Sequence, residues 1–341
     1  MLEPEWYHRP LDFEDILAGG SLILIGTISI TISLLVSSVM WKQDKMVVGY
    51  RFLCSASVSD IMLLFNYGIW PGLTILFKSE VICPSLRHWV QLYLDWAWFS
   101  MVWHFSLVGW SRWSAIRRPL SFRNQKRRFS YALCLGCYVL SLIQVLSTHF
   151  QPWYVTFYYE PSSFGMLAEN FPLYMSGGQS AMFLAFHVAA IVPPIIFYTW
   201  AVLYLLYRKK SSIITSVHNS QNLNNIERRL MLPCIINLVV FVVGQLVITY
   251  GTGETKWAGW TIMFLFCCNS AVNPLLLVFC SRSIRTQLLN MLGVRPSSCE
   301  KVLGETVLYQ NHVSQQEGIK GPLVTETIMQ MADSSESVVY V

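Results

Sequence analysis

The chain has 341 residues, of which 54% are hydrophobic and only 13% are charged, and its mean hydropathy is +0.44. Soluble globular proteins carry about 25% charged residues, so this composition argues against an ordinary soluble enzyme and against a disordered protein. The net charge of +5 comes from positive residues that gather between long apolar runs.

Seven runs contain almost no charged residue, and each is long enough for the ~20 apolar residues of a membrane-spanning helix. Only Asp60 and Asp95 interrupt these runs, which are 16–41, 52–77, 88–111, 129–159, 170–207, 230–253 and 257–281. None alternates with a period of two, as the strands of a membrane barrel do, and helices satisfy their own backbone in lipid. We therefore predict an all-α membrane protein, a seven-transmembrane helix bundle. The predicted helices are 18–40, 52–77, 88–113, 130–150, 181–207, 228–250 and 257–280.

The segments outside the helices are predicted in chain order as follows. Residues 1–17 form an outer tail, and 151–180 form an outer loop rich in aromatic residues, Pro and Gly. After the last helix, Ile284, Leu288 and Leu292 recur every four residues, which predicts a short amphipathic helix on the inner membrane surface. The seven-transmembrane receptor domain then spans 18–292, and the polar stretch 293–341 is predicted to be a disordered cytoplasmic tail.

The distribution of Lys and Arg predicts the orientation. If the N-terminus lies outside, 20 of the 24 Lys and Arg residues fall on the inner side, including Arg112 at a helix end. Positive residues accumulate in cytoplasmic loops, so we predict a multi-pass plasma-membrane protein with an outer N-terminus. The basic segment 117–128 is interpreted as an inner loop facing lipid headgroups, and no nucleic-acid partner is expected.

Ionisable residues inside a membrane are functional candidates by default. Asp60 lies in the middle of the second run, and Asn269, Ser270 and Asn273 lie on the seventh, where they are able to supply its polar partners. The alternative is a structural polar cluster that joins these two helices. Pro274 removes one backbone hydrogen bond and is expected to kink or loosen the seventh helix.

The nine cysteines do not suggest a disulfide framework. Seven lie in or beside the predicted helices, where they are interpreted as small packing residues. Cys83 is the one cysteine placed outside, and it is expected to be a free thiol or to bridge another molecule. No His or Cys accompanies Cys267 and Cys268 at metal-ligand spacing, so no metal site is expected.

Three short motifs follow one another on the right helices. S-V-S-D ends at Asp60, S-R-W-S-A-I-R-R-P-L covers 111–120, and N-S-A-V-N-P covers 269–274. Arg112 follows Asp60 by 52 residues. Together the motifs resemble those of rhodopsin-like (class A) G-protein-coupled receptors. The resemblance covers 18–292 and implies a receptor that passes an outer signal to a heterotrimeric G protein.

The resemblance also implies roles for single residues. Asp60 with Asn269 and Ser270 resembles a pocket for water and a sodium ion. Asn273 and Pro274 resemble the switch of the seventh helix.

The remaining implied roles belong to the inner end of the helices. Arg112 resembles the arginine that holds the inactive state and then meets the G protein. If Phe241 matches the phenylalanine of the family's sixth helix, Glu227 occupies the place of the acidic partner of that arginine.

Several positions depart from the family pattern. Ser111 replaces the acidic neighbour of the arginine, Trp113 and Leu277 replace two tyrosines, and 241–247 lacks the expected Cys-Trp-x-Pro. Such divergence is similar to that of nematode serpentine chemosensory receptors. It leaves open a non-signalling seven-helix partner of another receptor. An ion- or proton-coupled transporter is less favoured because no internal repeat is seen.

The sequence excludes some classes of ligand. No lysine for a retinal Schiff base occurs within 257–281, so retinal is not expected, and no other cofactor is implied. Leu94 stands where amine receptors carry an aspartate. Asp95 lies about 100° further round the helix, either as an off-register counter-ion or buried against a neighbouring helix. Trp98 and His187 are further ligand candidates, with packing as their alternative. The acidity of the outer segments favours a cationic or peptide ligand.

No catalytic set of residues appears, and the protein is not expected to be an enzyme. The tail suggests two further partners. Phosphorylation of D-S-S-E-S at 333–337 creates an anionic segment suited to an arrestin. Val339 to Val341 end the chain in a pattern that binds PDZ-type sheet edges.

Overall fold

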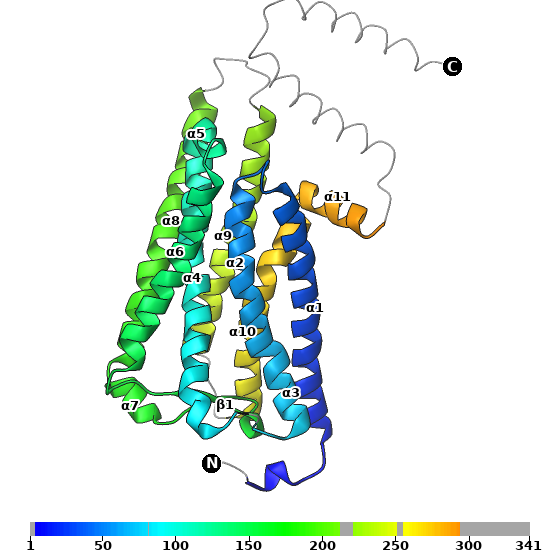
Figure 1. Ribbon diagram of the computed structural model, residues 1–341, viewed down its shortest axis with the longest axis vertical. Helices are drawn as coiled ribbons and strands as arrows, with labels where there is room; N and C mark the ends of the chain where they lie inside the picture. Colours follow the sequence, from blue (N-terminus) through cyan, green and yellow to red (C-terminus); the bar gives the residue numbers. More distant parts are fainter. Residues whose placement is uncertain (1–3, 81, 212–220, 251–254, 294–341) are drawn as a thin grey trace, which may run out of the picture. The chain divides into compact units, whose positions relative to one another are not determined.

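The computed structural model describes residues 4–80, 82–211, 221–250 and 255–293, with side-chain detail for 5–80, 82–207, 231–247 and 255–293. Within these ranges, seven long helical segments run side by side as a bundle (Figure 1). The second of them is continuous but has three parts: α2 (Gly49–Leu64), a π-helical turn (Phe65–Ile69) and α3 (Trp70–Phe77). The other six are α1 (Phe13–Gln43), α4 (Arg87–Arg117), α6 (Arg127–His149), α8 (Gln179–Ser211), α9 (Gln221–Tyr250) and α10 (Lys256–Cys280).

Five of the described helical segments are long and apolar enough to cross a membrane: α1, α2 to α3, α6, α8 and α10. α4 is not one of these five segments. It packs against α2, α6, α8 and α9, and the polar residues that face these helices lower its mean hydropathy. Large apolar side chains point outward from the bundle, as lipid-facing residues do; examples are Leu24, Leu34, Leu135, Leu184 and Leu203. The predicted all-α membrane bundle is confirmed.

One end of the bundle, here called the basic end, carries the short helices α5 (Pro119–Arg123) and α11 (Arg282–Met291) (Figure 1). α11 is the predicted amphipathic helix, and its Ile284 is fully buried. Asp44, between α1 and α2, accepts hydrogen bonds from Arg127 and from the hydroxyl of Tyr131 at 2.8 Å. Burial raises the pKa of the Asp44 carboxyl, but these two donors outweigh burial and hold it below its usual value.

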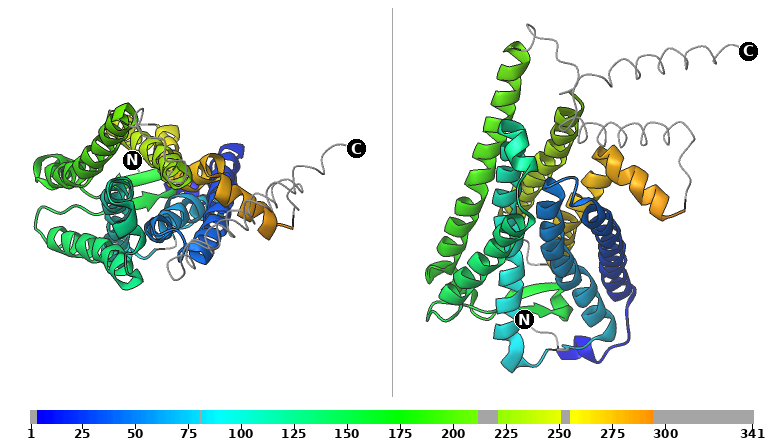
Figure 2. Two further views of the ribbon diagram at one scale, coloured as in Figure 1. Left: turned by 90° about the horizontal axis from the view of Figure 1, so that it is seen from above. Right: turned by 45° about the horizontal axis from the view of Figure 1, so that its top comes forward.

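The opposite end, here called the hairpin end, carries two short strands that were not predicted. β1 (Phe157–Glu160) pairs antiparallel with β2 (Gly165–Ala168), and Phe157 lies opposite Ala168. The hairpin lies across this end of the bundle when it is viewed along the helices (Figure 2, left). Phe164, at its tip, is fully buried and packs on Trp257 of α10. A short 3-10 helix (Pro4–Tyr7) and α7 (Phe171–Ser176) lie at the same end.

α1 begins at Phe13, five residues before the predicted start, because Asp12 and Asp15 form a capping box around its first turn. Asp15 is buried and also pairs with Lys78 at 2.9 Å, which fixes the end of α3 to the N-terminal segment. Cys83 follows in the exposed connection to α4, and the cysteines within the described ranges form no disulfide with one another. The Ser85 side chain donates a hydrogen bond to Cys83 Sγ at 3.3 Å, which lowers the pKa of the thiol.

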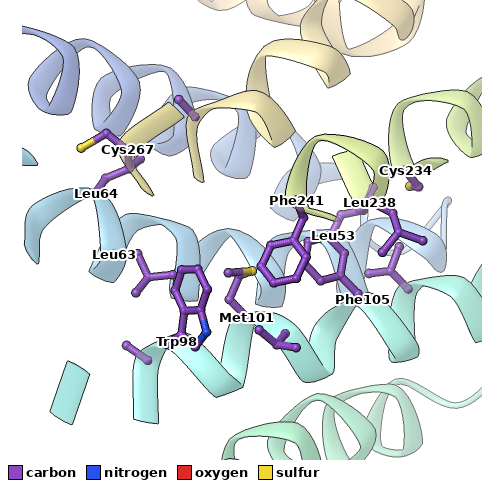
Figure 3. Close-up of a cluster of buried hydrophobic side chains, with 14 of the residues drawn as sticks. Leu53, Leu63, Leu64, Trp98, Met101, Phe105, Cys234, Leu238, Phe241 and Cys267 are labelled. Carbon is purple, nitrogen blue, oxygen red and sulfur yellow. The ribbon is translucent and has the colours of Figure 1, made fainter. Parts of the chain in front are cut away.

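The core of the bundle lies between α2, α4, α9 and α10. Figure 3 shows Trp98 and Phe105 of α4 beside Phe241 of α9, with Leu53 of α2 close by. The Phe241 ring centroid lies 5.0 Å from that of Phe105 and 5.7 Å from that of Trp98. These rings separate a polar cluster towards the basic end from a cavity at the hairpin end.

Candidate functional site

The predicted polar cluster joins α2 and α10. Asp60 is buried in α2, and Asn273 of α10 donates a hydrogen bond from Nδ2 to Asp60 Oδ2 at 3.0 Å. The two residues are 213 positions apart in the chain. A buried carboxylate is costly without such a partner. Pro274 follows Asn273 inside α10, which continues as a helix to Cys280.

A small cavity of about 20 Å³ lies beside Asp60. It is lined by residues of α2, α4, α8, α9 and α10, among them His104, Tyr198 and Asn237. His104 Nδ1 donates to the Ser100 carbonyl at 2.6 Å, so His104 Nε2 accepts from the Ser55 hydroxyl at 2.9 Å. This volume accommodates one water molecule or a small ion.

Three buried oxygens near this cluster have no hydrogen-bond partner among the described residues. They are Asn269 Oδ1, Ser270 Oγ and Asn237 Oδ1. Asn269 and Ser270 were predicted to join Asp60, but among the described side chains only Asn273 forms a hydrogen bond with it. Asn237 was not predicted, although the same rule of a polar residue in an apolar run applies to it. Oxygens of this kind suit water or a hard cation such as sodium.

Arg112 lies near the basic end of α4 with a fully buried side chain. Its Nη2 donates to the carbonyl oxygen of Gly49, the first residue of α2, at 3.4 Å. Gly49 permits this approach, since a Cβ there would lie 2.6 Å from Arg112 Nη1. Ser111 donates its hydroxyl to the Val108 carbonyl at 2.7 Å. The side chain of Glu227, the predicted partner of Arg112, lies outside the described residues.

A larger cavity of about 300 Å³ opens at the hairpin end. Its walls come from the π-helical turn and α3, from α4, from the hairpin and from α10, including Tyr67, Leu94, Tyr159 and Met263. Leu94 is thus the one ligand candidate from the sequence that lines this cavity. Small-molecule sites commonly occupy about 300–1,000 Å³, so the cavity is at the lower end of that range.

The other three ligand candidates face elsewhere. Trp98 Nε1 donates to His187 Nε2 at 2.9 Å, and the His187 ring stacks on Phe241, so both side chains pack in the core. Asp95 accepts from Gln91 at 2.7 Å and from the Tyr154 hydroxyl at 3.0 Å. Asp95 is buried, its Oδ2 lies 3.9 Å from Nε2 of His149 on α6, the fourth long helix, and it is not among the residues lining the cavity.

The described part of α10 has a single lysine, Lys256, and it stands at the first position of the helix. Its Nζ pairs with Glu14 at 2.9 Å. The described residues also hold no group of three or more His, Cys, Asp or Glu side chains that is arranged for a metal ion.

Comparison with known proteins supports the fold. The chain matches no protein-family model and no curated protein. It is similar to the crystal structure of squid rhodopsin, with a TM-score of 0.67, 14% sequence identity, and coverage of 85% of this chain and 84% of that chain. The protein therefore has the rhodopsin-like seven-helix fold. At this sequence identity the similarity establishes only the fold. The function has to be argued from the arrangement of this chain's own residues.

Proposed function

We propose that the protein is a receptor that converts binding of an outer ligand into activation of a heterotrimeric G protein. The observation that carries this proposal is the fully buried Arg112, held against the first residue of α2 at the basic end of a rhodopsin-like bundle. A buried guanidinium keeps its charge and has a high desolvation cost, which favours a functional role over a packing role.

Signalling requires α9 to move away from α4 at the basic end and open a cleft for the G protein. This is a shift between two packed states. Arg112 leaves its contact with Gly49 in this step and meets the G protein. Glu227, on the first turns of α9, is proposed as its inactive-state partner. Asn273 and Pro274 of α10 complete the switch.

The cluster around Asp60 is proposed as a water and sodium pocket between the two ends. The carboxylate of Asp60 supplies charge, and the partnerless oxygens of Asn269, Ser270 and Asn237 supply neutral ligands. A bound cation stabilises the packing in which these groups converge, so sodium favours the inactive state.

The proposal also covers location and partners. The protein is placed in the plasma membrane with its hairpin end outside, and it binds membrane lipids at its basic segments. An arrestin and a PDZ-type protein are proposed partners of the tail, and no retinal is bound. A chemosensory role is proposed from the divergence at Trp113 and Leu277. These departures also favour the second candidate, a non-signalling partner of another receptor.

The test is second-messenger output in cells that express a panel of G proteins, with and without a ligand screen. Arg112→Ala should abolish output at normal surface expression. Arg128→Ala is the matched control, because Arg128 is exposed at the same end. Normal signalling by Arg112→Ala would refute the proposed switch. A wild-type protein that reaches the surface and activates no G protein would favour the non-signalling partner.

A further inference from the structure

The cavity at the hairpin end has walls of one chemical kind. Its lining is dominated by aromatic and aliphatic side chains from four separate elements; the aromatic ones are Phe65, Tyr67, Trp70, Tyr93, Phe157, Tyr158 and Tyr159. Apolar walls of this kind bind apolar and aromatic ligands through burial and ring stacking.

The two charged residues that line the cavity neutralise each other. Arg87 Nη2 lies 2.7 Å from Glu80 Oε2, and both side chains are partly exposed. The Arg87 guanidinium also stacks over the Tyr158 ring, 3.8 Å from its centroid. A charged ligand would have to break this pair or enter an apolar site without a counter-ion, and both are unfavourable.

Few side-chain polar groups lie in the wall. The hydroxyl of Tyr159 is buried and forms no hydrogen bond with any described residue. Asn66 and Tyr93 are engaged, since Asn66 Nδ2 donates to the Tyr93 hydroxyl at 3.2 Å and to the Met62 carbonyl at 2.7 Å. The same burial keeps the Tyr159 hydroxyl away from a ligand in the cavity, so the wall offers a ligand mainly apolar burial and ring stacking.

We propose that this cavity is the ligand site of the receptor and that it takes a compact, uncharged, mainly aromatic molecule. This rests on the proposed receptor function and narrows its ligand. It also replaces the cationic ligand that the acidity of the outer segments suggested. The acid nearest the expected amine position, Asp95, is already engaged with Gln91 and Tyr154.

Three probes of one size test the proposal: 2-phenylethanol, its cationic analogue 2-phenylethylammonium and its anionic analogue phenylacetate. Binding to the full chain in nanodiscs is titrated by saturation-transfer NMR, with empty nanodiscs as the blank. We expect 2-phenylethanol to bind saturably at roughly millimolar concentration or below, as its size allows. Both ions should bind at least about ten-fold more weakly, because each lacks a free counter-charge.

Variants separate this site from general partitioning. Leu94→Trp fills the cavity and should abolish binding, whereas Leu203→Trp on the lipid-facing surface should not change it.

The ion pair supplies the sharpest control. Arg87→Gln leaves Glu80 unpaired and should shift preference towards the ammonium probe. Glu80→Gln leaves Arg87 unpaired and should shift preference towards phenylacetate.

Three results would overturn the proposal: equal affinity for the three probes, binding that survives Leu94→Trp, or no saturation by 2-phenylethanol up to about 10 mM. The assay measures binding without a G protein. A failure here is therefore distinct from a failure of the Arg112 experiment, which tests the receptor function itself.

Discussion

Gly49→Ala is the smallest change that tests whether the buried contact of Arg112 holds the resting state. A Cβ at Gly49 would lie 2.6 Å from Arg112 Nη1 and 3.1 Å from Arg112 Cζ. The obstructing atoms belong to the end of a long side chain, so the guanidinium moves while the backbone of α2 stays in place. The variant should therefore displace Arg112 without removing it.

The size of the effect follows from the contact that is lost. Hydrogen bonds to charged groups contribute about 1.5–3 kcal/mol. The bond from Arg112 to the Gly49 carbonyl is long, at 3.4 Å, so we take about 1 kcal/mol as its contribution. Loss of that amount from the resting state changes a two-state ratio about five-fold. Ligand-free activity should rise by this factor.

The assay is GTPγS loading of G proteins by membranes that contain equal amounts of surface receptor. Gly136→Ala is the matched control, because a Cβ there meets nothing within 4 Å. Both variants exchange a helical glycine for alanine, which by itself favours the helix by up to about 1 kcal/mol. Equal ligand-free activity in the two variants would refute the idea that the Arg112 contact restrains the receptor.

Three further predictions concern other parts of the protein. Sodium should raise the melting temperature of the wild type relative to equal potassium, but not that of Asp60→Asn; an equal rise in both would exclude the sodium pocket. Impermeant maleimide should label Cys83 on intact cells, and faster than an ordinary thiol at pH 7.5 because its pKa is lowered; labelling only after permeabilisation would reverse the proposed orientation. The Asp44 carboxyl has a pKa below its usual 3.8, so its stabilising effect is complete above about pH 4 and is lost as the pH falls through the lowered value. Thermal unfolding should show Asp44→Asn less stable than wild type at pH 6 and the difference narrowing below pH 4, and a constant difference would contradict this.

The helices and the Asp60–Asn273 pair could be predicted from the sequence. Charge-free runs of sufficient length report membrane spans directly, and a carboxylate inside such a run needs a polar partner. The hairpin was not predictable in the same way. Its strands are four residues each, too short for an alternating pattern, and Phe164 at its tip is fixed by packing on Trp257 of α10, far along the chain.

The ligand candidates show where sequence reasoning stops. Leu94 and Asp95 are neighbours, yet one lines the cavity and the other binds Tyr154, because adjacent helical positions face different directions. Trp98 and His187 were both ligand candidates, but their spacing does not reveal that they bond to each other instead of lining the cavity.

Although residues 241–247 lack the family's Cys-Trp-x-Pro, a series of ring contacts connects the two ends of the bundle. Tyr67 lines the cavity at the hairpin end, and its ring centroid lies 6.4 Å from that of Trp98. The Phe241 ring centroid lies 5.7 Å from that of Trp98 and 5.0 Å from that of Phe105. Phe105 lines the small cavity beside Asp60. Contact alone is not coupling, which requires an element with two arrangements. Phe241 is the member of this series on α9, the helix that must move in the proposed mechanism. A repacking of Phe241 against Trp98 is therefore the step through which a ligand beside Tyr67 would act on α9.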